Sequence, residues 1–207
     1  MRVRLIYGVL SLFLIPLVSP AGHEEEVRKS ADSRRSGLSA VIHASPSIFI
    51  MDKGAQPVPR MIGFMLEHNR ALDTVYLKRL ITIYIRESEL EGINYEVAFC
   101  QMCLETGFLR FDGSVSRFQN NFCGLGAINA FTAGDWFGSM EEGIRAHIQH
   151  LKAYASIDSL KGIQVDKRFY HVRRGTVFTV FDLTGRWASD PRYGEKIDYL
   201  LRKLYKE

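Results

Sequence analysis

The stretch that decides the fold, residues 98–126, reads AFCQMCLETGFLRFDGSVSRFQNNFCGLG. Its first part has a helical pattern in which Ala98, Met102 and Leu104 are candidates for the core. Gly107 supplies the left-handed residue that commonly ends a helix. The remainder is rich in glycine, asparagine and aromatic residues and has no regular period, which is typical of an irregular loop. The stretch therefore predicts a helix that ends at Glu105–Thr106, followed by a long loop.

Local signals predict further helices on both sides of this stretch. Residues that can cap a helix N-terminus precede three of the helices, glycines follow two, and a proline opens the last one. The expected helices cover residues 61–69, 73–92 (capped by Asp73), 94–106 (capped by Asn94), 139–155 (opened by a capping box of Ser139 and Glu142) and 191–205, with Pro191 in the first turn. These signals predict a mainly α fold.

The N-terminus has the layout of a secretory signal peptide. Arg2 and Arg4 precede an apolar run over residues 5–18, and small residues follow it at 19–21. The run is shorter than the roughly 20 apolar residues that an α-helix needs to cross a bilayer. We therefore expect residues 1–21 to be cleaved, which leaves no stable membrane span and sends the protein to the periplasm or the exterior. An uncleaved anchor is the alternative.

Removal of this segment also changes the charge. The 207 residues include 27 Lys and Arg against 23 Asp and Glu, a formal charge of +4. Cleavage after residue 21 removes two arginines and no acid, so the excess falls to +2. That excess is too small to indicate nucleic acid as a partner. Residues 22–57 are expected to be a flexible linker or tail with one strand-like or docking piece at 47–51, and residues 58–207 form the domain.

The cysteines and two of the histidines could suggest a metal or redox site. Cys100 and Cys103 form a CxxC pair, but no second pair supplies the four ligands of a structural zinc site. Buried thiols are expected instead, and a bridge from Cys123 to one of the pair is a second possibility. His147 and His150 lack an HExxH arrangement, which favours a packed or solvated pair. We expect no metal and no other cofactor.

Glu105 has the clearest chemical signal in the sequence. A carboxylate in the last turn of a helix meets the negative end of the helix dipole, which raises its pKa. Shielding by Phe108, Phe111 or Phe122 would raise the pKa further. A carboxylic acid that stays protonated near neutral pH can protonate a leaving glycosidic oxygen. A solvated glutamate without a catalytic role is the alternative that its position alone leaves open.

Three motifs extend this interpretation beyond one residue. They are Gln101-x-x-Leu104-Glu105-Thr106-Gly107, Asn120-Asn121-Phe122-Cys123-Gly124-Leu125-Gly126, and Trp187-Ala188-Ser189-Asp190-Pro191-x-Tyr193-x-x-Lys196-Ile197. In this order they resemble the bacterial glucosaminidase family (the mannosyl-glycoprotein endo-β-N-acetylglucosaminidase-like domain), over about residues 59–204. The resemblance implies a lysozyme-like helical domain and a glycoside hydrolase. Its expected partner is the glycan of peptidoglycan, cut at the β-1,4 bond after N-acetylglucosamine.

The resemblance also implies roles for individual residues. Glu105 would be the general acid. Tyr193 would be a second catalytic residue, which lines the site and helps to hold the N-acetyl group of the substrate or the reactive intermediate, unless its hydroxyl only anchors the last helix. Asn120 and Asn121 would offer amide groups to the substrate, or else tie down their own loop. The expected substrate-binding residues are Asn120, Asn121, Phe122, Trp136 and Asp112.

The sequence leaves several candidates for the second catalytic group. Family members often carry it on a small β-lobe, but only 14 residues separate Gly124 from Ser139, so this lobe is expected to be reduced. Asp112 and Asp135 are candidates, although each also fits an ordinary turn. The acetamido group of the substrate is a third possibility. Two rival functions stay open: a muramidase or lytic transglycosylase, and a catalytically silent wall-binding module.

Overall fold

The computed structural model describes residues 45–113, 115–127 and 134–206. This part contains the five α-helices α2 (Val58–His68), α3 (Thr74–Glu91), α4 (Tyr95–Glu105), α5 (Met140–Ala155) and α6 (Tyr193–Leu204), and the short 3₁₀ turns η1 (Arg117–Gln119) and η2 (Val180–Leu183). No β-strand forms among the described residues, which hold two isolated bridges. The mainly helical fold is therefore confirmed and is consistent with a lysozyme-like domain. The predicted signal peptide lies outside the described residues.

Side-chain caps set the helix starts where the sequence predicts them. Asp73, Asn94 and Ser139 each accept a backbone N–H from the first turn of α3, α4 and α5, respectively. Gly92 ends α3 in the left-handed conformation, with a φ of 77°. Each cap joins atoms only a few residues apart, so the local sequence is enough to place it.

The start of α6 differs from the prediction. Pro191 lies in the turn before the helix, whereas the sequence predicts it in the first helical turn. The N–H of Tyr193 donates to the carbonyl oxygen of Asp190 at 3.1 Å, and the N–H of Arg192 donates to the Asp190 carboxylate at 3.0 Å. These two bonds close a turn at Asp190, so the helix begins only at Tyr193.

The segment before α2 is part of the folded domain. Phe49 forms an antiparallel bridge with Thr179, and the N–H of Ile50 donates to the carbonyl oxygen of Phe178 at 2.9 Å. The side chain of Ile50 is fully buried. Residues 48–50, within the strand-like or docking piece expected at 47–51, thus pair with residues 178–180. The boundary expected between a tail over 22–57 and a domain over 58–207 stays a prediction.

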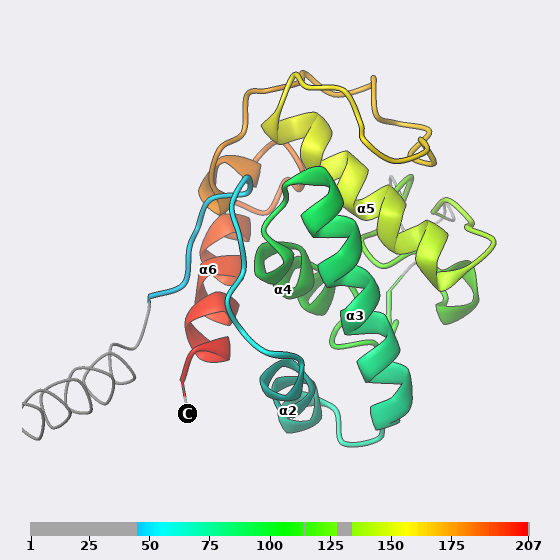
Figure 1. Cartoon of the computed structure of the whole chain (residues 1–207), viewed down its shortest axis with the longest axis vertical. Helices are drawn as coiled ribbons and strands as arrows, with labels where there is room; N and C mark the ends of the chain where they lie inside the picture. The colour runs from blue at the N-terminus through cyan, green and yellow to red at the C-terminus, as the bar shows by residue number, and fades with distance from the viewer. Residues whose placement is uncertain (1–44, 114, 128–133, 207) are drawn as a thin grey trace, which may run out of the picture. The chain divides into compact units, whose positions relative to one another are not determined.

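Helix α4 lies at the centre of the domain. All of residues 95–103 are buried, and α3, α5 and α6 pack against them. Figure 1 shows α4 between α6 and α3. A helix that is buried on every side belongs to the core. Because only its last turn reaches the surface, α4 carries Glu105 to the boundary between core and solvent.

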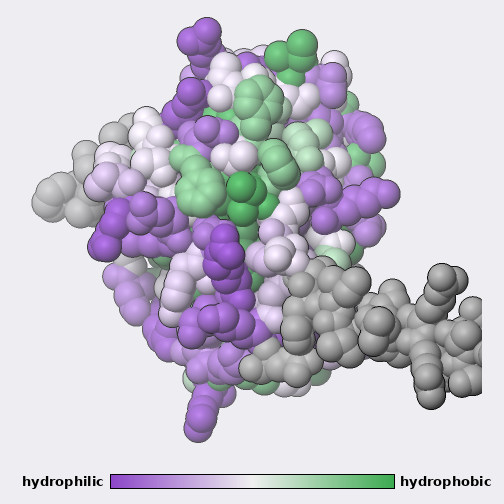
Figure 2. Space-filling view, turned by 90° about the vertical axis from the view of Figure 1, so that its left-hand side faces the viewer, coloured by the Kyte–Doolittle hydropathy of each residue, from purple (hydrophilic) through white to green (hydrophobic). Residues whose placement is uncertain are grey.

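The face of the molecule in Figure 2 is largely hydrophilic, with a small group of apolar side chains surrounded by hydrophilic ones. Some exposed apolar surface is normal in globular domains. Among the described residues, no helix has both the length and the apolar character needed to cross a membrane.

Candidate active site

The carboxylate of Glu105 lies where three segments meet. Tyr193, the first residue of α6, donates its hydroxyl hydrogen to Oε1 of Glu105. Trp187, in the segment before α6, lies close enough to this carboxylate to lower its pKa. The other oxygen, Oε2, lies 3.6 Å from the point that a Cβ would occupy at Gly124. One carboxylate oxygen thus faces α6, and the other faces the loop that the second sequence motif forms.

The surroundings of Glu105 raise its pKa. Its side chain is accessible to solvent, but dense packing of protein around the carboxylate makes burial the largest influence on the pKa. The hydrogen bond from Tyr193 and the nearby Trp187 act in the opposite direction and do not cancel this increase. The direction is the one expected from the sequence, although burial is its main cause. An accessible carboxyl group with a raised pKa can meet a substrate while it still holds a proton.

Gln101 holds the tyrosine that contacts Glu105. Its Nε2 donates to the hydroxyl oxygen of Tyr193 at 2.9 Å, and both side chains are buried. No individual role was expected for Gln101, which belongs to the first motif. Gln101 stands four residues before Glu105, so both lie on one face of α4. This spacing is the feature of the sequence from which its position near the site could have been predicted. The structure thus brings the predicted Tyr193 to Glu105, and its catalytic role stays a prediction.

The two asparagines of the second motif fold their own loop. Nδ2 of Asn121 donates to the carbonyl oxygens of Leu125 at 2.8 Å and Asp135 at 3.1 Å, and its Oδ1 accepts the N–H of Leu125 at 3.0 Å. Nδ2 of Asn120 donates to the carbonyl oxygen of Phe137 at 3.0 Å. The structure therefore shows a loop-shaping role for both amides, while their contact with substrate stays a prediction.

The other predicted site residues lie in different surroundings. Phe122 is buried in the core, whereas Trp136 is 62% exposed. Asp112 is exposed and lines a hollow of about 630 Å³. Asp135 forms an ion pair with Arg168, with Oδ2 and Nε 3.0 Å apart. Of the two candidates for the second acid, Asp135 is thus paired with the guanidinium group of Arg168, whereas Asp112 is exposed at the hollow.

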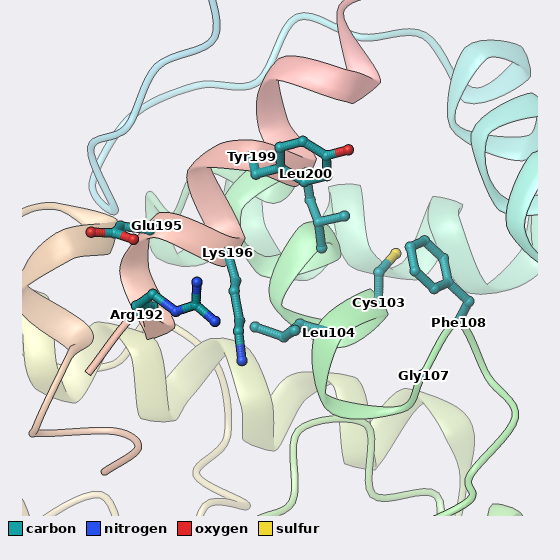
Figure 3. A pocket seen from close by; sticks show the side chains of 9 residues that line it. All are labelled: Cys103, Leu104, Gly107, Phe108, Arg192, Glu195, Lys196, Tyr199 and Leu200. Atoms are coloured by element: carbon teal, nitrogen blue, oxygen red, sulfur yellow. The ribbon is translucent and has the colours of Figure 1, made fainter. Parts of the chain in front are cut away.

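A second hollow, of about 490 Å³, lies between the end of α4 and the start of α6. In Figure 3, Arg192 and Lys196 extend toward Leu104 at this hollow. Leu104 and Gly107 line it, and the larger hollow includes Leu109 among its walls. Residues next to Glu105 in the sequence therefore help to form two concave surfaces, which is the shape that a polymer-binding site needs.

The thiols and the histidine pair belong to the packed interior. Cys100, Cys103 and Cys123 are buried and free, as the preferred sequence interpretation predicts. His147 and His150 are buried too, and the Nδ1 atom of His150 lies 2.8 Å from the carboxylate of Asp166. Within the described part of the chain, no group of three or more His, Cys, Asp or Glu residues could hold a metal ion.

The asparagine loop rests on α5 at Gly143. A Cβ at this position would lie 1.7 Å from the carbonyl oxygen of Asn120, so any larger side chain forces the loop away. We expect Gly143→Ala to lower the free energy of unfolding by about 1–3 kcal/mol in a urea titration, which outweighs the gain of about 1 kcal/mol in helix propensity. Gly63→Ala in α2 is the control, because no atom lies within 4 Å of its added Cβ, and it should be stabilising. Equal effects of the two changes would contradict the close contact.

Comparison with known proteins places the chain in a family. The sequence profile of the glucosaminidase family, described as mannosyl-glycoprotein endo-beta-N-acetylglucosaminidase, matches residues 81–206. The chain belongs to this family. The glucosaminidase chain is also 41% identical over 201 residues to an uncharacterized protein of Borreliella burgdorferi, which covers 97% of this chain and 93% of that protein. No solved structure matches it.

Family membership confirms the resemblance that the three motifs indicated. The matched region includes the last turns of α4 with Glu105, the asparagine loop and Tyr193. The chain is therefore a glycoside hydrolase domain, and its function is of the peptidoglycan hydrolase kind.

Proposed function

We propose that this glucosaminidase hydrolyses the β-1,4 bond after N-acetylglucosamine in peptidoglycan, with Glu105 as the general acid. The environment of Glu105 carries the proposal. Its carboxyl group is accessible, its pKa is raised by burial, and its Oε1 is held by Tyr193. A glycosidase needs such a group to protonate the oxygen that leaves the sugar.

The proposed reaction begins with transfer of the Glu105 proton to the glycosidic oxygen. The bond between C1 and that oxygen then breaks, and its electron pair stays on the oxygen, which leaves positive charge on the sugar ring. A water molecule adds to C1 and returns a proton to Glu105. The hydroxyl of Tyr193 stabilises the ionised carboxylate between these two steps, because it donates a hydrogen bond to Oε1.

The group that stabilises the charge at C1 has three candidates. Asp135 is engaged by Arg168, and Asp112 is exposed beside the larger hollow. The acetamido group of the substrate is the third candidate, and it needs no protein carboxylate. An aspartate that activates water on the opposite face of the ring takes the water proton in place of Glu105 and inverts C1, whereas an aspartate nucleophile or the acetamido group retains its configuration. An inverted anomer released first would therefore identify an aspartate base, and a retained anomer would exclude one.

We also propose that the protein acts outside the cytoplasm. The sequence of residues 1–21, with a basic start, a short apolar run and small residues at its end, supports export. The location of peptidoglycan outside the cell membrane agrees with this proposal.

Mass spectrometry of digested peptidoglycan tests the proposed bond. We expect fragments with reducing N-acetylglucosamine ends. Reducing muramic acid ends would instead identify a muramidase, and anhydro-muramic ends a lytic transglycosylase. Intact glycan that the protein binds but does not cut would indicate a wall-binding module. Any of these three results would overturn the proposal.

A further inference from the structure

A buried chain of hydrogen bonds connects four helices to Glu105. The hydroxyl of Tyr84 in α3 lies 3.0 Å from Nδ1 of His147 in α5. Nε2 of His147 lies 3.0 Å from Oε1 of Gln101 in α4. The Gln101 amide then donates to Tyr193 in α6 at 2.9 Å, and Tyr193 donates to Glu105. The first three side chains are fully buried, so no water competes for these bonds.

The directions of these hydrogen bonds depend on one another. An ionised Glu105 only accepts, so Tyr193 gives it its single hydroxyl hydrogen. The Tyr193 oxygen accepts from the amide nitrogen of Gln101, which turns the amide oxygen toward His147. His147 therefore carries its hydrogen on Nε2, and its Nδ1 accepts the hydroxyl hydrogen of Tyr84. All four donors point toward Glu105.

Burial of His147 preserves this arrangement. The burial of the ring, with a smaller contribution from His150, lowers the pKa of His147 to about 3. The imidazole is thus neutral at any pH at which the protein is expected to work, and it keeps one donor and one acceptor nitrogen. The groups that face it are Tyr84 from α3, Gln101 from α4, His150 with its partner Asp166, and Trp187 from the segment before α6.

We propose that His147 and Gln101 are positioning residues that keep the catalytic proton of Glu105 on Oε2. Because Tyr193 occupies Oε1 as a donor, the acid form of Glu105 carries its hydrogen on the other oxygen, beside Gly124. In the reverse direction, Glu105 would donate from Oε1 into the chain, and its proton would point away from the substrate. This inference rests on the proposed role of Glu105 as the general acid.

Two substitutions at His147 form a matched test. His147→Asn places an amide near the position of Nδ1, where it can still meet Tyr84 but does not reach Gln101. His147→Gln reaches the position of Nε2 and can donate to Gln101. We expect His147→Asn to lower kcat on peptidoglycan about tenfold, as for the loss of one hydrogen bond, with KM within about twofold of the original. His147→Gln should restore most of kcat.

The pH dependence of kcat/KM distinguishes a positioning role from a purely structural one. It would stay the same if His147 and Gln101 only stabilised the fold. When His147 no longer supports Gln101, Tyr193 donates less strongly and the ionised form of Glu105 loses stabilisation. The pKa of Glu105 then rises, so the alkaline limb of kcat/KM moves to higher pH in His147→Asn and in Gln101→Met but not in His147→Gln. The groups that face Glu105 are Tyr193, Trp187 and the Cys123 thiol, whose own pKa burial raises well above its usual value.

A carbon-13 NMR titration of the glutamate carboxyl groups measures the same pKa without catalysis. The signal of Glu105 is the one that Glu105→Gln removes, and Gln101→Met supplies the comparison if His147→Asn does not fold. An equal kcat and an equal Glu105 pKa in His147→Asn and His147→Gln would overturn the inference. If Glu105→Gln is inactive in that case, the proposed function still stands. Full activity of Glu105→Gln would instead overturn the proposed function, whatever the titration shows.

Discussion

Glu105→Gln should lower kcat for peptidoglycan cleavage by a factor of about 10²–10⁴, the usual contribution of a general acid. The glutamine keeps the shape of the side chain and can accept the hydroxyl hydrogen of Tyr193, but it has no proton to give to the glycosidic oxygen. KM should change little, because the substitution leaves the walls of both hollows intact. Release of soluble fragments from purified peptidoglycan measures the rate.

Glu89→Gln is the matched control for this experiment. Glu89 is an exposed residue of α3 outside the candidate site, so the same exchange of a carboxyl group for an amide should leave kcat unchanged. Thermal unfolding of both variants shows whether the fold is intact. If Glu105→Gln cleaved glycan at the rate of Glu89→Gln, Glu105 would not be the general acid. A wild-type protein that binds glycan as well as Glu105→Gln and cuts none would be a wall-binding module.

Lys152→Met is expected to have the largest effect on stability, a loss of about 3–5 kcal/mol in the free energy of unfolding. Nζ of Lys152 in α5 lies 2.6 Å from the carboxylate of Glu91 in α3, and both side chains are only 2% exposed. The same carboxylate accepts the backbone N–H groups of Lys161 and Gly162. Removal of the ammonium group therefore leaves a buried carboxylate without its counter-charge. Urea unfolding at neutral pH measures the loss.

A double substitution and a surface control complete this test. Glu91→Leu combined with Lys152→Met removes both charges, so it should be more stable than Lys152→Met alone. Lys78→Met changes an exposed residue of α3 and should alter the free energy of unfolding by less than about 0.5 kcal/mol. Equal losses in Lys78→Met and Lys152→Met would show that the buried pair does not join α3 to α5.

The sequence predicts most helix ends because the bonds that fix them are local. Asp73, Asn94 and Ser139 cap backbone groups within their own first turns, and Gly92 ends α3 through its own backbone conformation. The start of α6 is predicted less well, because the side chain of Asp190 extends the preceding turn. A proline signal alone does not distinguish that turn from the first turn of a helix.

The candidate site is predicted only in part, for a related reason. The motifs identify Glu105 and Tyr193, but they do not show that the side-chain amide of Asn121 forms its hydrogen bonds with backbone groups of Leu125 and Asp135. The sequence predicts that His147 is a packed or solvated histidine, and the structure shows that it is buried. Its hydrogen bonds to Tyr84 and Gln101 join residues that are 63 and 46 positions apart in the sequence. A periodic pattern covers only neighbouring turns of one helix, so it cannot predict these contacts.

By itself, the sequence determined the helical class, most helix ends, the family and the glutamate at the end of the buried helix. Local hydrogen bonding and hydrophobic periodicity, which act over a few residues, decide the helical class and the helix ends, whereas the family and the role of the glutamate follow from the resemblance of the three motifs. Only the tertiary structure decided that Tyr193 meets Glu105 across 88 positions, that burial raises the pKa of Glu105 against the effect of its hydrogen bond from Tyr193, and that Ile50 joins the core. These features depend on the packing of α4 against α3, α5 and α6, which brings distant side chains together.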